Sequence, residues 1–292
     1  RDDISFFVQD RAIFVMPEED ELQIIYEAKD SNSLIQRIRA IDAITSGDKS
    51  VVIAPISAAL KPLQPAQRFT DSIINLETGM RIDPAELRRK LVALGYVAAS
   101  VAASEGEFSA RGGIVDIFAP NHIDPVRLEF FDDEIDSIRY FDAESQISLE
   151  NADYVRICPA AEFVPTEEER LIALTKIIGE YDDRLARLSS ENKDGKLSDG
   201  RIDRIEELKD RIAEMFTECT NVQIFANYLK YFNIKDERIW DYIECSNDVS
   251  LMIYDPNRVE TEIPEYEEKS ESSSIFVKAF EDFLSKEENK DM

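Results

Sequence analysis

The spacing of apolar residues changes near residue 69, and this change constrains the fold of this 292-residue chain more than any other feature. Upstream, continuous apolar runs within residues 11–17 and 51–55 have the composition of buried strands. Between them, apolar residues recur at helical spacing over residues 34–44, after a helix-start signal at residues 30–32 and before Gly47. A strand, a helix and a strand in this order predict an α/β unit.

Downstream of residue 69, a single helix is followed by closely spaced short strands. The helix is expected at residues 84–94, and Gly, Pro, Asn and Asp interrupt the apolar runs that follow it. The strands are expected at residues 113–118, 126–131, 137–142 and 154–158. A meander of strands with one helix packed on the sheet is an α+β unit.

The last third of the chain predicts helices and then a return to strands. Two helical stretches within residues 166–216 flank a polar connector at residues 189–200. The apolar runs at residues 222–225 and 249–254 have the composition of strands, so the α/β unit is expected to resume there. A further strand is expected at residues 22–26, and a short amphipathic helix at residues 275–284.

These patterns predict a multidomain chain in which one unit is inserted into another. The expected divisions are 1–67 (first part of the α/β domain), 68–166 (the α+β domain), 167–216 (a helical segment), 217–261 (second part of the α/β domain) and 262–292 (an acidic linker with a short helix).

The formal charge of −27, from 61 acidic and 34 basic residues, limits the partners of this chain. A protein that binds duplex DNA must neutralise phosphates with Lys and Arg, so most of this surface is expected to repel DNA. The acidity serves either solubility alone or a basic or mixed partner surface.

The cellular setting is expected to be the cytoplasm. No apolar run approaches the roughly 18 residues that a bilayer span requires, and no signal peptide is recognisable. The three cysteines, Cys158, Cys219 and Cys245, form no CxxC pair, which favours a reducing compartment. The start of the sequence fits a piece of a longer protein.

Two segments imitate the motifs of nucleotide-hydrolysing enzymes. Residues 47–50 resemble the end of a Walker A loop, but a helix precedes them, a strand follows them, and Asp42 stands where the loop needs a glycine. Residues 251–255 have the form of a Walker B strand that ends at Asp255, but Pro256 replaces the acidic residue that would handle the attacking water. We expect no hydrolysis, no catalytic residue, no cofactor and no metal.

Two further features are weighed against simpler interpretations. The acidic run at residues 132–136 could pass for a metal-binding motif, but a charged hairpin turn between two strands is the favoured interpretation. His122, the single histidine, lies in a Pro/Asn turn and is expected to be a solvated loop residue rather than a base.

A specific resemblance covers roughly a third of the chain. Two stretches resemble the UvrA-binding domain shared by UvrB and the transcription-repair coupling factors. They are residues 106–118 (GEFSARGGIVDIF) and 125–135 (PVRLEFFDDEI). Shorter matches lie at residues 79–80, 87–88, 94–96 and 139–146, and weaker ones at residues 26–37 and 52–60.

The departures favour the coupling-factor family. UvrB has an Arg-x-Arg-Gly pattern, a true Walker A loop and a Tyr-rich hairpin, whereas here Ser109 precedes residues 110–112 and the other two features are missing. The resemblance implies an incomplete, degenerate P-loop-ATPase-like α/β domain that carries an inserted α+β domain. It also implies that UvrA is the partner, and that RNA polymerase and duplex DNA bind other domains of a full-length ATP-dependent DNA translocase.

The resemblance places five residues of this chain on or near the UvrA-facing surface: Arg111, Gly112, Phe118, Arg127 and Glu129. Arg111 is followed by two glycines, which would present its guanidinium with little obstruction, and the guanidinium can bind a carboxylate at two points. The alternative is that Arg111 pairs inside the domain with a local acid such as Glu107 or Glu129. Val97 is a departure from the family, because relatives often have an arginine at this position.

The favoured function is therefore docking of UvrA, which would couple stalled RNA polymerase to excision repair without catalysis by this chain. One alternative is a fragment of an ATP-dependent translocase or helicase such as UvrB, which a nucleotide-binding titration would reveal. Another is an acidic interaction or DNA-mimic protein unrelated to repair, which would bind a basic DNA-binding protein instead of UvrA.

Overall fold

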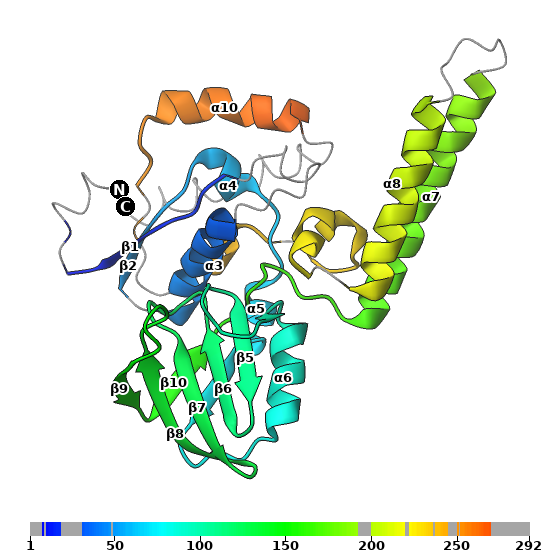
Figure 1. Cartoon of the computed structure of the whole chain (residues 1–292). Helices are drawn as coiled ribbons and strands as arrows, with labels where there is room; N and C mark the ends of the chain where they lie inside the picture. The colour runs from blue at the N-terminus through cyan, green and yellow to red at the C-terminus, as the bar shows by residue number, and fades with distance from the viewer. Residues whose placement is uncertain are drawn as a thin grey trace.

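The computed structural model describes residues 8, 10–18, 31–47, 49–191, 200–219, 222–235, 237–244, 250 and 252–269. It shows a mixed arrangement of sheets and helices around three hydrophobic clusters (Figure 1). The expected strand at residues 22–26 and helix at residues 275–284 lie outside the described residues.

The N-terminal α/β unit is confirmed. Strand β1 (Ala12–Val15) pairs in parallel with β2 (Ser50–Ile53), and helix α3 (Ser31–Ser46) connects them and packs on both. Gly47 ends α3 with a φ of +76°, a conformation that glycine adopts without steric cost. Two short helices follow, α4 (Ile56–Leu60) and α5 (Ala66–Asp71).

The predicted α+β unit is built on a six-stranded sheet in the order β4-β5-β6-β7-β8-β9. Its strands are β4 (Val97–Ala98), β5 (Glu107–Arg111), β6 (Ile114–Phe118), β7 (Val126–Phe131), β8 (Glu134–Phe141) and β9 (Ser148–Ala152). From β5 to β9 each strand pairs antiparallel with the next, as a meander requires.

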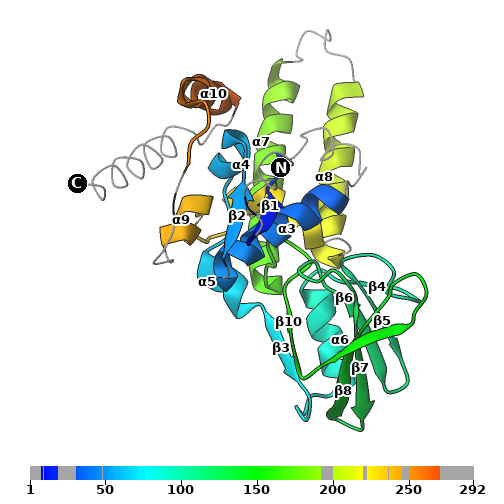
Figure 2. The same ribbon diagram turned by 90° about the vertical axis from the view of Figure 1, so that its left-hand side faces the viewer.

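Helix α6 (Pro84–Ala93) packs against one face of this sheet, as Figures 1 and 2 show. Asp83 caps it by accepting a hydrogen bond of 2.6 Å from the main-chain N–H of Ala85, and Pro84 stands in the first turn, where its missing N–H costs nothing. The buried side chains beneath α6 include Leu87, Leu91 and those of the inward-facing strand residues.

One strand of this unit lies elsewhere than predicted. Strand β10 (Tyr154–Ile157) does not extend the meander but pairs antiparallel with β3 (Ile74–Glu77), a strand that the sequence pattern did not indicate. Strand β8 also begins three residues earlier than expected, directly after the turn at Asp132 and Asp133. The hairpin interpretation of the acidic run at residues 132–136 is therefore confirmed.

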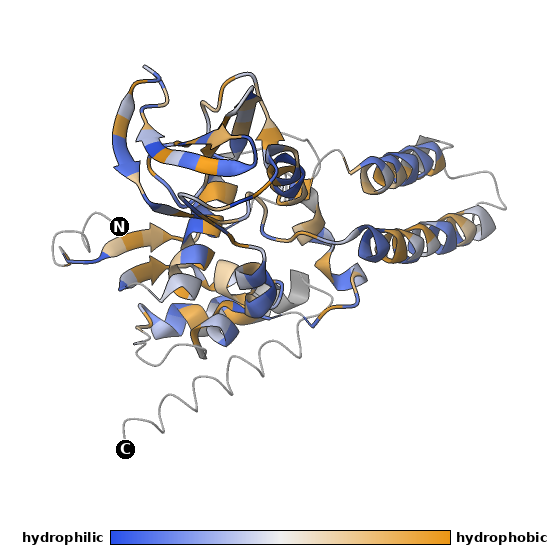
Figure 3. Ribbon diagram, turned by 90° about the horizontal axis from the view of Figure 1, so that it is seen from below, coloured by the Kyte–Doolittle hydropathy of each residue, from blue (hydrophilic) through white to orange (hydrophobic). Residues whose placement is uncertain are grey.

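Two long helices form a hairpin that projects from the rest of the chain (Figures 1 and 3). They are α7 (Glu167–Glu191) and α8 (Gly200–Glu218), as predicted. Hydrophilic and hydrophobic residues alternate along both, as expected for helices with one buried side (Figure 3). At the base of the hairpin, Phe216 packs edge to face against Phe225 with ring centroids 5.0 Å apart.

The expected return to strands is wrong. Residues 222–225 begin a 3-10 helix, η2 (Val222–Tyr231), because Phe225 is fully buried against the base of the hairpin rather than added to a sheet. Ser250 and residues 252–254 belong to no strand, and the other residues of the expected strand at 249–254 lie outside the described part. Helix α9 (Ile239–Glu244) contributes Trp240 to the core of the α/β unit.

A helix, α10 (Pro256–Lys269), occupies the segment that was expected to start an acidic linker at residue 262. Two of its apolar side chains, Val259 and Ile263, pack on the core of the α/β unit. None of the helices in the described part of the chain has a stretch sufficiently long and apolar to cross a membrane.

Arginine–carboxylate pairs join the sheet unit to the elements around it. The pairs are Arg37–Glu162, Arg39–Glu105, Arg156–Asp42 and Arg68–Glu169. The first is buried, with side chains 0% and 2% exposed. Lys61 also reaches Glu162, at 3.5 Å. The three pairs made by α3 hold the sheet unit against it, and Arg68–Glu169 connects α5 to α7; we call these four pairs the junction.

A candidate docking site on the outer sheet face

The two faces of the six-stranded sheet differ in chemistry because side chains alternate along each strand. Val115, Leu128 and Ile138 lie opposite one another and point toward α6, where all are buried. Their neighbours Asp116, Arg127 and Arg139 also lie opposite one another and point away from α6. We call this second side the outer face; its charged residues include Arg111, Asp116, Arg127, Glu129 and Arg139.

Asp116 is the centre of the outer face. It is fully buried and accepts two hydrogen bonds from Arg127, of 2.7 Å to Nε and 2.9 Å to Nη2. A second arginine, Arg111, approaches the same carboxylate at 3.6 Å. Arg111 therefore has a local acid as neighbour, as the alternative interpretation allowed, and this acid is Asp116.

The two arginines differ in how much of their side chain remains available. Arg127 is 15% exposed, donates a third bond of 3.2 Å to Gln146, and lies 4.5 Å over the ring of Phe141. Arg111 is 59% exposed, and its contact with Asp116 is the longer of the two. Arg111 can therefore bind a partner, whereas the fold already uses most of the donors of Arg127.

Glu129 is also engaged within the sheet. It pairs with Arg139 and accepts a hydrogen bond of 3.1 Å from Ser137. Arg139 lies directly opposite Arg127, so each of these like-charged residues turns to a different carboxylate. Three arginines, Arg111, Arg127 and Arg139, thus contact the two carboxylates Asp116 and Glu129 on the outer face.

Two glycines at the β5–β6 turn explain why Arg111 is exposed. Gly112 has a φ of +59°, and a side chain there would meet open space. At Gly113 a Cβ would approach the carbonyl oxygen of Phe130 to 3.0 Å, so a larger residue would push β7 away. The turn consequently holds Arg111 at the end of the sheet, where β6 separates it from β7.

The residue that sequence reasoning missed is Phe131. It lies at the end of β7, at the same end of the sheet as Arg111, and 79% of it is exposed. The signal was present in the alternation of β7, since Phe130 packs on the core and its neighbour must then point outward. An exposed aromatic ring beside an exposed arginine is a combination that recurs in protein interfaces.

Phe118 does not belong to the exposed surface. It lies on β6 but is only 8% exposed, so it has little area to offer a partner. Phe118 is buried at the end of the sheet farthest from the Arg111 turn, and its place on or near the UvrA-facing surface stays a prediction.

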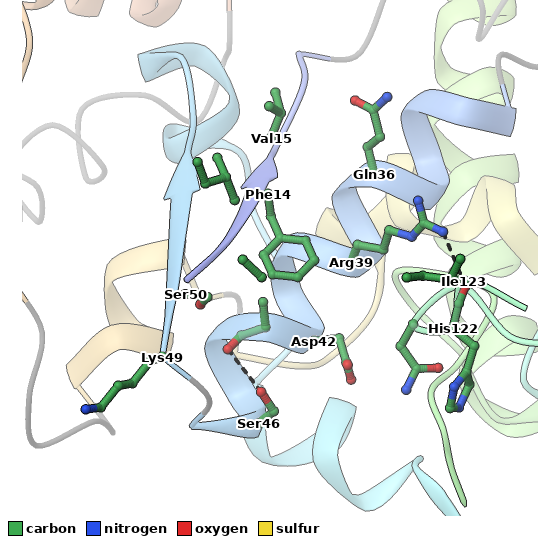
Figure 4. A pocket seen from close by; sticks show the side chains of 14 residues that line it. Phe14, Val15, Gln36, Arg39, Asp42, Ser46, Lys49, Ser50, His122 and Ile123 are labelled. Atoms are coloured by element: carbon green, nitrogen blue, oxygen red, sulfur yellow. Dashed lines mark hydrogen bonds between the residues drawn. The ribbon is translucent and has the colours of Figure 1, made fainter. Parts of the chain in front are cut away.

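A cavity of about 540 Å³ lies at the junction, between β1, α3 and the loop after β6 (Figure 4). Figure 4 shows Arg39 reaching from α3 toward His122 and Ile123. Arg39 donates to the carbonyl oxygens of Pro120, at 2.6 Å, and His122, at 3.4 Å, and pairs with Glu105. The charged groups of this cavity therefore hold the sheet unit against α3.

The described residues around the apparent nucleotide motifs lack the local structure of a phosphate site. Helix α3 precedes Lys49 and strand β2 follows it, the reverse of a Walker A loop, and Lys49 points away from Arg39 and Asp42 (Figure 4). Asp255 has a φ of +54°, and Met252 and Tyr254 before it are more than nine-tenths exposed. Residues 252–254 belong to no strand, and the Walker B-like interpretation of Asp255 stays a prediction.

His122 is not the solvated residue that the sequence suggested. Its Nε2 lies 2.9 Å from the carbonyl oxygen of Arg156 and its Nδ1 lies 3.3 Å from the hydroxyl of Tyr140. Burial lowers the pKa of His122, although its hydrogen bond to the main chain opposes this. It is thus a half-buried packing residue between the loop and the sheet.

Known proteins match both the sheet unit and most of the chain. The family described as the UvrB interaction domain matches residues 74–163. A transcription-repair-coupling factor of Bacillus subtilis is 31% identical over 274 residues, which cover 94% of this chain and 22% of that protein. Another from Staphylococcus epidermidis is 37% identical over 166 residues, covering 57% of this chain and 14% of that protein.

The chain spans about a fifth of the length of the Bacillus subtilis relative. The matched residues 74–163 run from β3 to the segment after β10 and include every strand of the outer face. Residues 74–163 therefore match the UvrB interaction domain, within a chain that is similar over most of its length to part of a transcription-repair-coupling factor.

Proposed function

We propose that this chain docks UvrA on the outer face of its six-stranded sheet, around Arg111. The observation that carries the proposal is the exposed guanidinium of Arg111 at the end of a sheet that matches the UvrB interaction domain. UvrA is the partner because the residues that match this domain also resemble the UvrA-binding domain of coupling factors.

The chemistry of the outer face suits a partner that presents carboxylates. Arg111 is held by a rigid turn, so little conformational freedom is lost when it binds. Phe131 supplies apolar area at the same end of the sheet, and the paired residues Arg127 and Glu129 surround these two with a polar rim. An exposed aromatic group and an arginine within a polar surround form the usual arrangement of an interface hot spot.

The remaining elements act as a support for the docking domain. We propose that residues 1–67 and 217–261 derive from a degenerate P-loop ATPase and that residues 68–166 are inserted between them. The reversed order around Lys49 supports the proposal that this chain does not hydrolyse nucleotides. In the full-length parent, separate domains bind RNA polymerase and duplex DNA, and this chain passes the stalled complex to excision repair in the cytoplasm.

The test is calorimetric titration of UvrA into the wild-type chain and two variants. We expect Arg111→Ala to weaken binding by roughly 2 kcal/mol or more, about thirtyfold in affinity. Arg111→Lys recovers only part of this, because an ammonium group lacks the planar fork that binds a carboxylate at two points. The melting temperature changes little, since exposed residues usually contribute within about 0.5 kcal/mol to folding.

The matched control is Arg88→Ala, which removes the same charge from the exposed side of α6, on the opposite side of the sheet. It should leave UvrA binding unchanged. Unchanged affinity of Arg111→Ala together with a lowered melting temperature would show that Arg111 is a structural residue. Tight nucleotide binding by the wild-type chain would instead support the translocase alternative.

A further inference from the structure

The last strand of the six-stranded sheet has a free edge. Strand β9 (Ser148–Ala152) pairs with β8 on one side and with no described residue on the other (Figure 1). Four of its five residues are exposed. Free strand edges present unpaired N–H and C=O groups and are templates for the addition of another strand.

The direction of the main chain shows which residue offers these groups. Phe141 of β8 donates its N–H to the carbonyl oxygen of Pro125, on the β7 side. Main-chain groups alternate in direction along a strand, so Arg139, two residues earlier, also faces β7. Its partner across the β8–β9 ladder is Asn151. The N–H and C=O of Asn151 therefore point to the free edge.

The side chains along this edge are apolar and acidic. Ile147 and Leu149 are 66% and 54% exposed. Glu144, Glu150 and Asp153 are also exposed and lie within a few residues of them. An added strand with alternating apolar and basic side chains would cover the exposed apolar residues and neutralise the acidic ones.

A second copy of this chain does not fit the edge. Antiparallel pairing of two β9 strands about their middle residue would place Glu150 opposite Glu150 of the other copy, and like charges opposite each other destabilise a sheet. The acidic residues thus oppose self-association and select a basic segment.

We propose that the free edge of β9 binds an extended polypeptide segment of a partner protein, with alternating apolar and basic residues, by strand addition. The free edge is on β9, the last strand of the sheet, whereas Arg111 lies on β5, near the other side of the strand order. The proposal therefore stands independently of UvrA docking. The main-chain groups of Asn151 supply the hydrogen bonds, and Leu149 supplies the apolar contact.

The test uses the complete chain and a short acetylated peptide of alternating Lys and Val, measured by fluorescence anisotropy. Asn151→Pro removes the outward N–H without a change in charge, and proline is tolerated on an edge strand when its nitrogen faces solvent. We expect about tenfold weaker binding. Leu149→Ala should also weaken binding, whereas Val92→Ala, at a similarly exposed position on α6, should not.

A second readout is hydrogen exchange by NMR, in which the peptide should slow exchange of the Asn151 amide. Equal binding of the peptide by all variants would mean that it responds only to the net charge, and would overturn the proposal. The absence of wild-type binding, or equal binding of a Glu–Val peptide, would overturn it as well. Leu149→Ala decides the outcome if Asn151→Pro fails to fold.

Discussion

The junction and the outer face are both built from arginines and carboxylates, but they place them differently. At the junction Arg37 and Glu162 are buried, and Glu162 has a second cation in Lys61. On the outer face Arg111 remains 59% exposed although it lies near a buried carboxylate. A buried pair cannot lose one member without leaving a bare charge, whereas an exposed arginine can change partners at low cost. The same chemistry therefore holds the fold in one place and is available for binding in the other.

The largest effect is expected at the junction. Arg37→Ala leaves the buried Glu162 with only the longer contact to Lys61, and removing one partner of a buried ion pair costs about 3–5 kcal/mol of stability. Urea unfolding followed by circular dichroism measures the loss. The double variant Arg37→Met with Glu162→Leu should recover much of it, because no bare charge remains. If Arg37→Ala lowered the free energy of unfolding by less than about 1 kcal/mol, the buried pair would contribute no more than an exposed ion pair does. The contrast between the junction and the outer face would then be wrong.

Acid should weaken the junction, because two of its carboxyl groups have a lowered pKa. Burial alone raises the pKa of Glu162, but the charges of Arg37 and Lys61 outweigh it and hold the pKa at about 2. The hydrogen bonds from Arg68 likewise lower the pKa of Glu169 to about 2.

Both carboxyl groups have a lower pKa in the folded chain than the ordinary value of 4.5. They therefore stabilise the fold above pH 4.5, and this stabilisation is lost as the pH falls toward 2. Thermal melts between these limits should show it, and the Glu169→Gln variant should show a smaller decrease. A melting temperature that is independent of pH in this range would contradict the assigned role of both groups.

The smallest effect is expected for Phe131, the exposed aromatic residue at the Arg111 end of the sheet. Phe131→Ala should weaken UvrA binding by about 1 kcal/mol, roughly fivefold, because an exposed aromatic anchor loses its contact area. Stability should remain within about 0.5 kcal/mol of wild type. Ile123→Ala is the matched control, since it is 87% exposed but lies at the opposite end of the sheet. Equal losses for both variants would place the docking surface elsewhere.

The sequence predicted the elements whose ends carry local signals. Asp83 and Pro84 marked the start of α6, and Gly47 marked the end of α3. Strand β9 was not predicted because its exposed, polar residues have no apolar alternation. The run at residues 222–225 was misassigned because a short apolar segment suits a strand or a buried helix equally, and contacts with Phe216 decided between them.

Only part of the candidate site could be predicted in the same way. The exposure of Arg111 follows from the two glycines after it, which are visible in the sequence. The role of Asp116 could not be foreseen, because its contact with Arg127 depends on the register of β6 against β7. A shift of one residue would move all these side chains to the opposite face. The burial of Phe118 could not be foreseen for a related reason, since burial at the end of a strand depends on elements distant in sequence.

The position of Asp116 between two arginines has a consequence for the lifetime of a complex. When a partner's carboxylate takes Arg111, Asp116 keeps both hydrogen bonds from Arg127. No buried charge is left bare while the partner arrives or departs, so the barrier to dissociation contains little desolvation of Asp116. Affinity differences between related complexes arise mostly from the dissociation rate. The outer face is thereby suited to brief, selective encounters that end without any rearrangement of the sheet.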